Sequence, residues 1–166
     1  GTDKGYIEFE KKTPYGWRPH SYSIYYNALF SHCRKDIKLI LECGIGSNNL
    51  DVESNMTTKG KPGASLRVWK EYFDNAQIIG ADIDKRILFQ EDRISTYEVN
   101  QLDPSSIKNM WSKIKHNNFD IIIDDGLHTL EAGLTFFLNS FEKLKEGGIY
   151  LIEDVDFSYL NELKDK

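Results

Sequence analysis

The chain has few cysteines and prolines, no long apolar run and no excess of basic residues. Its 166 residues include two cysteines and four prolines, and the net charge is -5. Cys33 and Cys43 alone make neither a disulfide framework nor a zinc site. The acidic balance gives no support for binding to nucleic acid, which usually needs a basic face. The apolar runs are far shorter than the roughly 20 residues that span a bilayer.

These absences leave a globular protein with neither a nucleic-acid nor a membrane partner. The length fits one domain, 1–166, within which 1–35 forms an N-terminal extension of helix and loop. The segment Gly1–Gly5 does not have the features of a signal peptide, and Cys43 sits in a strand-like apolar run as a small buried residue. We therefore expect a cytoplasmic protein. A homo-oligomer is compatible with these features.

Five short segments rich in β-branched and aliphatic residues alternate with helical patterns. Four of the five are apolar nearly throughout, as strands buried on both faces are. Strands that alternate with helices predict an α/β fold with a Rossmann-like, doubly wound parallel sheet. The expected strands are 38–43, 77–82, 95–99, 119–124 and 148–152, and the expected helices are 22–34, 65–73, 104–115 and 129–144.

A glycine-rich turn and a polar insertion follow the first expected strand. Glu42, Gly44 and Gly46 form the pattern E-x-G-x-G, in which glycines let the backbone approach a ligand closely. A simple tight turn is the alternative. The insertion 47–62 is polar, and loops of this length in compact domains are usually functional or disordered. Ser65, which follows it, either caps the next helix or donates a hydrogen bond to a bound carboxylate.

Two further polar positions follow the second and third expected strands. Asp82, with Ile83 beside it, ends the second strand, where an acidic side chain can accept hydrogen bonds from the hydroxyls of a ribose. The alternative, a helix N-cap, suits Asp84 better than Asp82. Gln101 follows the third strand, where a polar side chain can meet an adenine, and Asp103 fits a helix cap.

Two acidic pairs follow the fourth and fifth expected strands. Asp124 and Asp125 open the run DDGLH, and Glu153 and Asp154 form the second pair. Carboxylates that meet at one edge of a sheet repel and raise one another's pKa, and a Mg²⁺ ion resolves that conflict. Capping and solvated charge are the alternative. Beside these carboxylates, His128 becomes a candidate general base.

Together the motifs of this chain resemble the macrocin O-methyltransferase-like family of class I enzymes that use S-adenosylmethionine (SAM). The motifs are GTDKG, HSY, LECGIG, PGASLRVWKEYF, GADID, DIIIDDGLH and GGIYLIEDV, and they extend over nearly the whole chain. The resemblance implies methyl transfer from SAM to a hydroxyl of a glycan, a nucleotide sugar or a glycosylated natural product. A complete sheet of this class has two more strands. We therefore expect these C-terminal strands to be missing, and the open edge to be covered by further residues or a partner subunit.

The resemblance also implies a role for each motif residue. His128 and Asp125 are the expected catalytic residues, with His128 as the general base. The expected ligands of the divalent cation, usually Mg²⁺, are Asp125, Glu153 and Asp154. The expected SAM-binding residues are Glu42, Gly44, Gly46, Ser65, Asp82, Ile83, Gln101 and Asp124.

Three alternative functions remain open. A catechol-type enzyme would grip vicinal hydroxyls of an aromatic ring with the same metal. A non-catalytic SAM or nucleotide sensor would use the acidic clusters only as caps. A nicotinamide oxidoreductase is disfavoured, because Asn49 stands where the dinucleotide fingerprint has its third glycine.

The N-terminal aromatic residues either line a sugar pocket or pack at an edge of the core. They are Tyr6, Phe9, Tyr15 and Trp17.

Overall fold

A six-stranded sheet with helices on both faces forms the described part of the chain. The computed structural model describes residues 4, 20–155 and 161. The strand order is β3-β4-β2-β1-β5-β6, and every neighbouring pair is parallel except β3 with β4. The strands are β1 (Leu39–Cys43), β2 (Gln77–Asp82), β3 (Gln90–Glu91), β4 (Ile94–Glu98), β5 (Phe119–Asp124) and β6 (Leu144–Ile152). The α helices are α1 (Tyr22–Phe30), α2 (Ala64–Tyr72), α3 (Pro104–Lys113) and α4 (Leu130–Ser140), and the 3₁₀ turns are η1 (Lys85–Ile87) and η2 (Phe141–Lys143).

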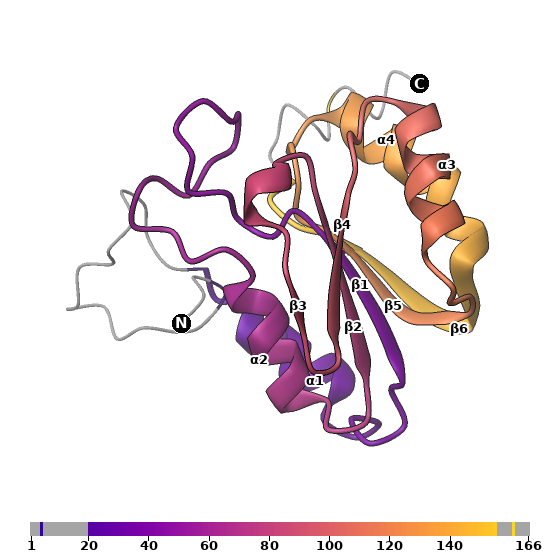
Figure 1. Ribbon diagram of the computed structural model, residues 1–166. Coiled ribbons are helices and arrows are strands. Elements are labelled where there is room, and N and C mark those ends of the chain that lie inside the picture. Colours follow the sequence, from indigo (N-terminus) through magenta and orange to yellow (C-terminus); the bar gives the residue numbers. More distant parts are fainter. Residues whose placement is uncertain (1–3, 5–19, 156–160, 162–166) are drawn as a thin grey trace.

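The two faces of the sheet are covered by different helices (Figure 1). Successive residues of a strand point to opposite faces, so one strand supplies two cores. Ile40 of β1 packs in the core beneath α1 and α2, whereas Leu39 and Leu41 pack in the core beneath α3 and α4. All five residues of β1 are buried. The predicted doubly wound sheet is therefore confirmed.

The element bounds differ from the sequence-based expectations by one or two residues at several elements and by more at a few. Helix α1 ends at Phe30, not at residue 34. The short antiparallel strand β3 was not expected, since two residues carry too little pattern to predict a strand. Helix α4 ends at Ser140, not at residue 144, because Leu144 already pairs with Phe119. Strand β6 begins four residues before the expected strand 148–152 and includes Gly147, which has a φ of 72° beside a register shift.

Several caps follow from the sequence. The Asp103 side chain accepts a hydrogen bond from the Ser105 amide at the start of α3, and Asp84 caps η1 through the Arg86 amide. Helix α2 is different, because its N-cap is Gly63 in a left-handed conformation. Ser65 therefore lies within the first turn of α2, so the capping alternative is wrong, and a hydrogen bond from Ser65 to a bound carboxylate stays a prediction.

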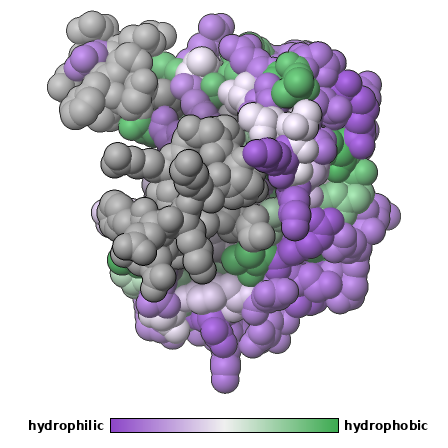
Figure 2. Space-filling model, turned by 90° about the vertical axis from the view of Figure 1, so that its left-hand side faces the viewer, coloured by the Kyte–Doolittle hydropathy of each residue, from purple (hydrophilic) through white to green (hydrophobic). Residues whose placement is uncertain are grey.

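The far edge of β6 pairs with no other strand among the described residues. The expectation that further residues or a partner subunit cover this edge stays a prediction. On the molecular face shown in Figure 2, hydrophilic residues predominate and hydrophobic ones form small separate patches. Every helix in the described ranges is too short or too polar to cross a membrane.

One buried carboxylate holds the amino ends of the central strands together. Asp120 accepts hydrogen bonds from the amides of Lys38 and Leu39, at 2.7 and 2.9 Å, and pairs with Lys145. We expect Asp120→Ala to lower the free energy of unfolding by about 1–3 kcal/mol, because two buried amides lose their acceptor. Urea unfolding measures this loss. The exposed Asp74→Ala is the control and should change stability by less than about 0.5 kcal/mol; equal effects of the two changes would contradict the prediction.

Candidate functional site

A large pocket opens at the carboxyl ends of the parallel strands. Its volume is about 690 Å³, within the range of small-molecule sites. Ligands of open α/β sheets bind at this edge, as the sequence motifs predict. Six predicted cofactor-binding residues line the pocket: Gly44, Gly46, Ser65, Asp82, Ile83 and Gln101. Glu42 and Asp124 do not, and both lie buried beneath the lining.

The turn after β1 requires its first glycine. Gly44 has a φ of 85°, and a Cβ atom there would lie 2.0 Å from the carbonyl oxygen of Asp125. Gly46 also has a positive φ, of 81°. The turn therefore runs directly against the end of β5 and presents bare backbone to the pocket, as a cofactor in close contact would need.

Asp82 ties this turn to the end of β2. One carboxylate oxygen accepts a hydrogen bond from the Ile45 amide and the other from the Asp84 amide, both at 2.9 Å. Burial raises the pKa of Asp82, although these amide hydrogen bonds oppose the shift. A carboxylate has about four acceptor positions, so Asp82 retains capacity for the hydroxyls of a ribose.

Gln101 connects the adenine side of the predicted site to the end of β5. Its side-chain nitrogen donates to Asp124 at 2.6 Å, and its oxygen accepts from the Leu127 amide at 2.9 Å. A Cβ atom at Gly126 would lie 1.8 Å from that oxygen. Asp124 thus holds Gln101 in place from below the pocket. Burial raises the pKa of Asp124 to about 6.

The polar insertion forms one wall of the pocket. Residues 51–56 line it, and no helix or strand interrupts 47–62. Asp84 accepts hydrogen bonds from Ser47 and Asn49 of the insertion, at 2.6 and 2.7 Å. Arg86 adds a second tie to Asp51 at 2.9 Å. No local pattern predicts this anchoring, because it joins residues 35 to 37 positions apart.

The two acidic motifs meet, together with the predicted base. His128 Nε2 lies 3.4 Å from Asp125 Oδ1 and 3.8 Å from Asp154 Oδ2. One ligand atom from each of these three residues lies within 4.8 Å of the others. His128 and Asp154 have positive φ values, 57° and 53°. Such conformations cost energy and cluster at functional sites, where the surrounding structure holds them.

Glu153, the third predicted metal ligand, lines the same pocket but does not belong to this trio. Its carboxylate accepts hydrogen bonds from Lys4, at 2.5 Å, and from the Tyr26 hydroxyl. Burial and the charge of Asp125 raise its pKa to about 8. Glu42 lies beside the same lysine, 3.4 Å from Lys4 Nζ, and accepts a hydrogen bond from Trp69 at 2.9 Å.

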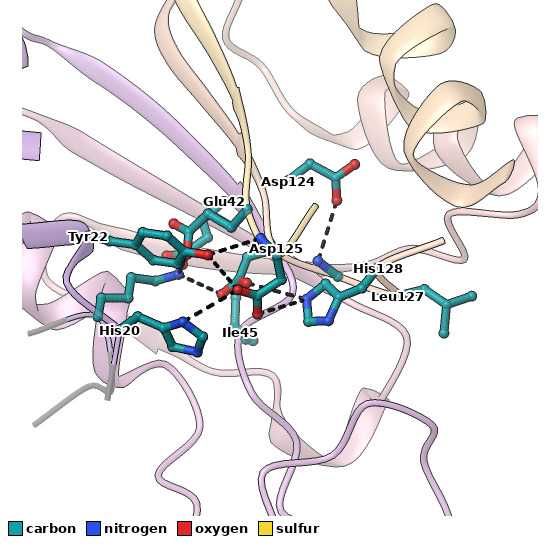
Figure 3. A network of polar contacts seen from close by, with 12 residues as sticks. His20, Tyr22, Glu42, Ile45, Asp124, Asp125, Leu127 and His128 are labelled. Atoms are coloured by element: carbon teal, nitrogen blue, oxygen red, sulfur yellow. Dashed lines mark hydrogen bonds and ion pairs between the residues drawn. The ribbon is translucent and has the colours of Figure 1, made fainter. Parts of the chain in front are cut away.

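Three further residues of the site belong to N-terminal motifs to which the sequence assigned no individual role. His20 stacks on Tyr22 with a centroid distance of 4.9 Å, and the Tyr22 hydroxyl donates to Asp154 at 2.5 Å. In Figure 3 the two rings lie on the side of Asp125 opposite His128. Lys4 is the third. The motifs GTDKG and HSY contain these residues, but nothing in their spacing links them to β5 or β6. Tyr6, Phe9, Tyr15 and Trp17 lie outside the described residues.

The donor set of this cluster fits a divalent cation. One ammonium, that of Lys4, faces three carboxylates, those of Glu42, Asp125 and Glu153. Burial raises the pKa of Glu42 to about 7 even though Lys4 opposes the shift. A single lysine therefore cannot balance three ionised carboxylates, and the raised pKa values of Glu42 and Glu153 show that this edge favours further positive charge, as protons or as a cation. Asp125 Oδ1 and Asp154 Oδ2 are oxygen ligands of the kind that Mg²⁺ prefers.

The chain is similar to curated sugar O-methyltransferases over most of its length. The 8-demethyl-8-alpha-L-rhamnosyl tetracenomycin-C 2'-O-methyltransferase of Streptomyces olivaceus is 32% identical over 143 residues, which is 86% of this chain and 35% of that protein. Demethylmacrocin O-methyltransferase of Streptomyces fradiae is 33% identical over 147 residues, 89% of this chain and 35% of that protein. No family model matches the chain.

A solved structure has the same fold. The MycE methyltransferase of the mycinamycin biosynthetic pathway, in complex with Mg and SAH, superimposes with a TM-score of 0.68 at 32% identity, covering 86% of this chain and 34% of that one. Another structure of that enzyme also contains mycinamycin VI. The chain spans about one third of the length of these relatives.

Proposed function

Because the chain is a homologue of the macrocin-type sugar O-methyltransferases, we propose that it is the SAM- and metal-binding core of such an enzyme. The acceptor is a hydroxyl of a sugar carried by a small molecule. The relatives named above support this choice over an aromatic diol. One observation carries the proposal: a glycine-walled pocket at β1 and β2 adjoins a cluster of Asp125, His128 and Asp154 at β5 and β6.

The residues divide the work between two halves of the pocket. Asp82 and Gln101 bind and orient SAM, whose methyl carbon is the group transferred. Asp125 and Asp154, together with Glu153 once its contact with Lys4 loosens, would hold the divalent cation, which would stabilise negative charge developing on a hydroxyl. Transfer is an in-line displacement on the methyl carbon, so positioning of the two reactants supplies much of the rate.

His128 accepts the proton of the acceptor hydroxyl. Burial opposes its protonation, but the hydrogen bond and charge of Asp125 outweigh burial and raise the pKa of His128. The cation, when bound nearby, acts in the opposite direction and lowers the pKa of His128.

Two cysteines without a disulfide bond suit the reducing cytoplasm, where we place the protein.

Cofactor binding is the first test of the proposal. SAH, the demethylated product, should bind saturably in calorimetry, and Asp82→Ala should weaken it about 10- to 100-fold, the effect of a lost hydrogen bond to a charged group. Asp120→Ala, at the opposite end of the sheet, is the matched control and should leave affinity unchanged. Binding of NADH with none of SAH would overturn the assignment. Screening sugar acceptors against vicinal aromatic diols then identifies the acceptor class.

A further inference from the structure

Lys4 places a positive charge inside the carboxylate cluster. Its side chain is 7% exposed, and its backbone carbonyl accepts a hydrogen bond from the Ser23 amide at the start of α1. The ammonium lies 2.6 Å from Asp125 Oδ2 and 2.5 Å from Glu153 Oε2. Burial alone would lower the pKa of Lys4, but the charges of Asp125, Glu42 and Glu153 hold it well above its usual value.

We propose that Lys4 is a built-in cation that competes with the divalent metal for Asp125 and Glu153. It is a positioning residue, because it acts on the metal ligands and not on the acceptor or the methyl group. The inference rests on the proposed function, since it requires that a divalent cation binds to this cluster.

Lys4 divides the oxygens of the ligands between two cations. Asp125 Oδ2 faces Lys4, whereas Oδ1 faces His128. Both oxygens of Glu153 are engaged, one by Lys4 and the other by the Tyr26 hydroxyl. Asp125 therefore keeps one oxygen, Oδ1, that does not contact Lys4 and can ligate a metal. Glu153 can ligate a metal only by loosening its contact with Lys4.

Lys4 should therefore make the affinity of these carboxylates for a divalent metal lower than it would be without the lysine. Without the ammonium, only protons or a metal ion could balance the buried carboxyl groups of Glu42, Asp125 and Glu153. Unit charges a few ångströms apart interact strongly at the effective dielectric constant of about 20 typical of proteins. Removing Lys4 should therefore strengthen attraction for a divalent ion, whereas removing a merely structural lysine would leave that attraction unchanged or weaken it.

The test is a calorimetric titration of the metal-free chain with Mg²⁺ alone. We expect Lys4→Met to bind Mg²⁺ at least about 10-fold more tightly than the wild type, or to bind an additional equivalent. Lys4→Arg keeps the charge and should stay within about 3-fold of the wild type. Lys145→Met is the matched control, because Lys145 also pairs with a buried carboxylate, Asp120, but at the other end of β5.

The outcomes separate this inference from the proposed function. If the wild type binds no divalent cation, the metal part of the proposed function fails. If the wild type binds Mg²⁺ but Lys4→Met binds it equally or more weakly, the competition by Lys4 is overturned and the metal site remains.

The inference stays testable if Lys4→Met unfolds without metal. Mg²⁺ should then restore its far-ultraviolet circular dichroism signal, because an ion that binds only the folded state stabilises that state. Failure of Mg²⁺ to restore folding would also overturn the proposal.

Discussion

EDTA should abolish methyl transfer, and Mg²⁺ or Mn²⁺ should restore it. A sugar hydroxyl keeps its proton at neutral pH and is a poor nucleophile. A bound cation contributes several kcal/mol of charge stabilisation in comparable sites, so we expect a loss of at least about 100-fold. Transfer of radiolabelled methyl groups to a glycosylated acceptor, with and without chelator, measures the effect. Full activity in EDTA would remove the metal from the mechanism.

The expected ligands should reproduce the effect of EDTA one at a time. Asp125→Ala and Asp154→Ala remove the two carboxylates that face His128, and Glu153→Ala removes the one held by Lys4. Each should lower activity as strongly as the chelator, with SAH binding retained. Asp51→Ala is the control, because Asp51 also lines the pocket but pairs with Arg86. A loss as large at Asp51 would show a general charge effect and not a ligand set.

The buried strands were the most predictable part of the fold. The segments 77–82 and 119–124 agree with β2 and β5 to the residue, because strands covered by helices on both faces are apolar throughout. The start of β6 was not predictable. Its first residues, from Leu144 to Gly147, include exposed charges and a glycine, and only pairing with Phe119 makes them a strand.

The candidate site was predictable where it follows strand ends and hidden where it depends on tertiary contacts. The glycine turn, Asp82 and the two acidic pairs all follow strands whose carboxyl ends meet at one edge, so chain position alone brings them together. Lys4 lies 121 residues from Asp125, and Tyr22 lies 132 residues from Asp154. No local pattern encodes such pairings, although the motifs that contain these residues were visible.

His128→Gln should lower kcat by about 10²- to 10⁴-fold and leave SAH binding nearly intact, because it removes only the proton acceptor. Glutamine keeps much of the size and polarity of the side chain at this strained position. Calorimetry with SAH controls for an intact pocket. If His128→Gln retained full kcat, positioning alone would account for the rate.

The pH dependence of the wild type gives His128 a second test. A general base works in its neutral form, so kcat should rise as pH increases through the pKa of His128 and level off above it. Asp125 raises that pKa in the folded, metal-free chain, with burial opposing the shift. The contribution of His128 to stability is therefore fully present below the unfolded value of about 6.5 and is lost as pH rises through the folded value. The stability difference between wild type and His128→Gln in EDTA should shrink accordingly across that window. In saturating Mg²⁺, the rise in kcat should lie at lower pH than this loss of stability in the metal-free chain, because a nearby cation disfavours the imidazolium.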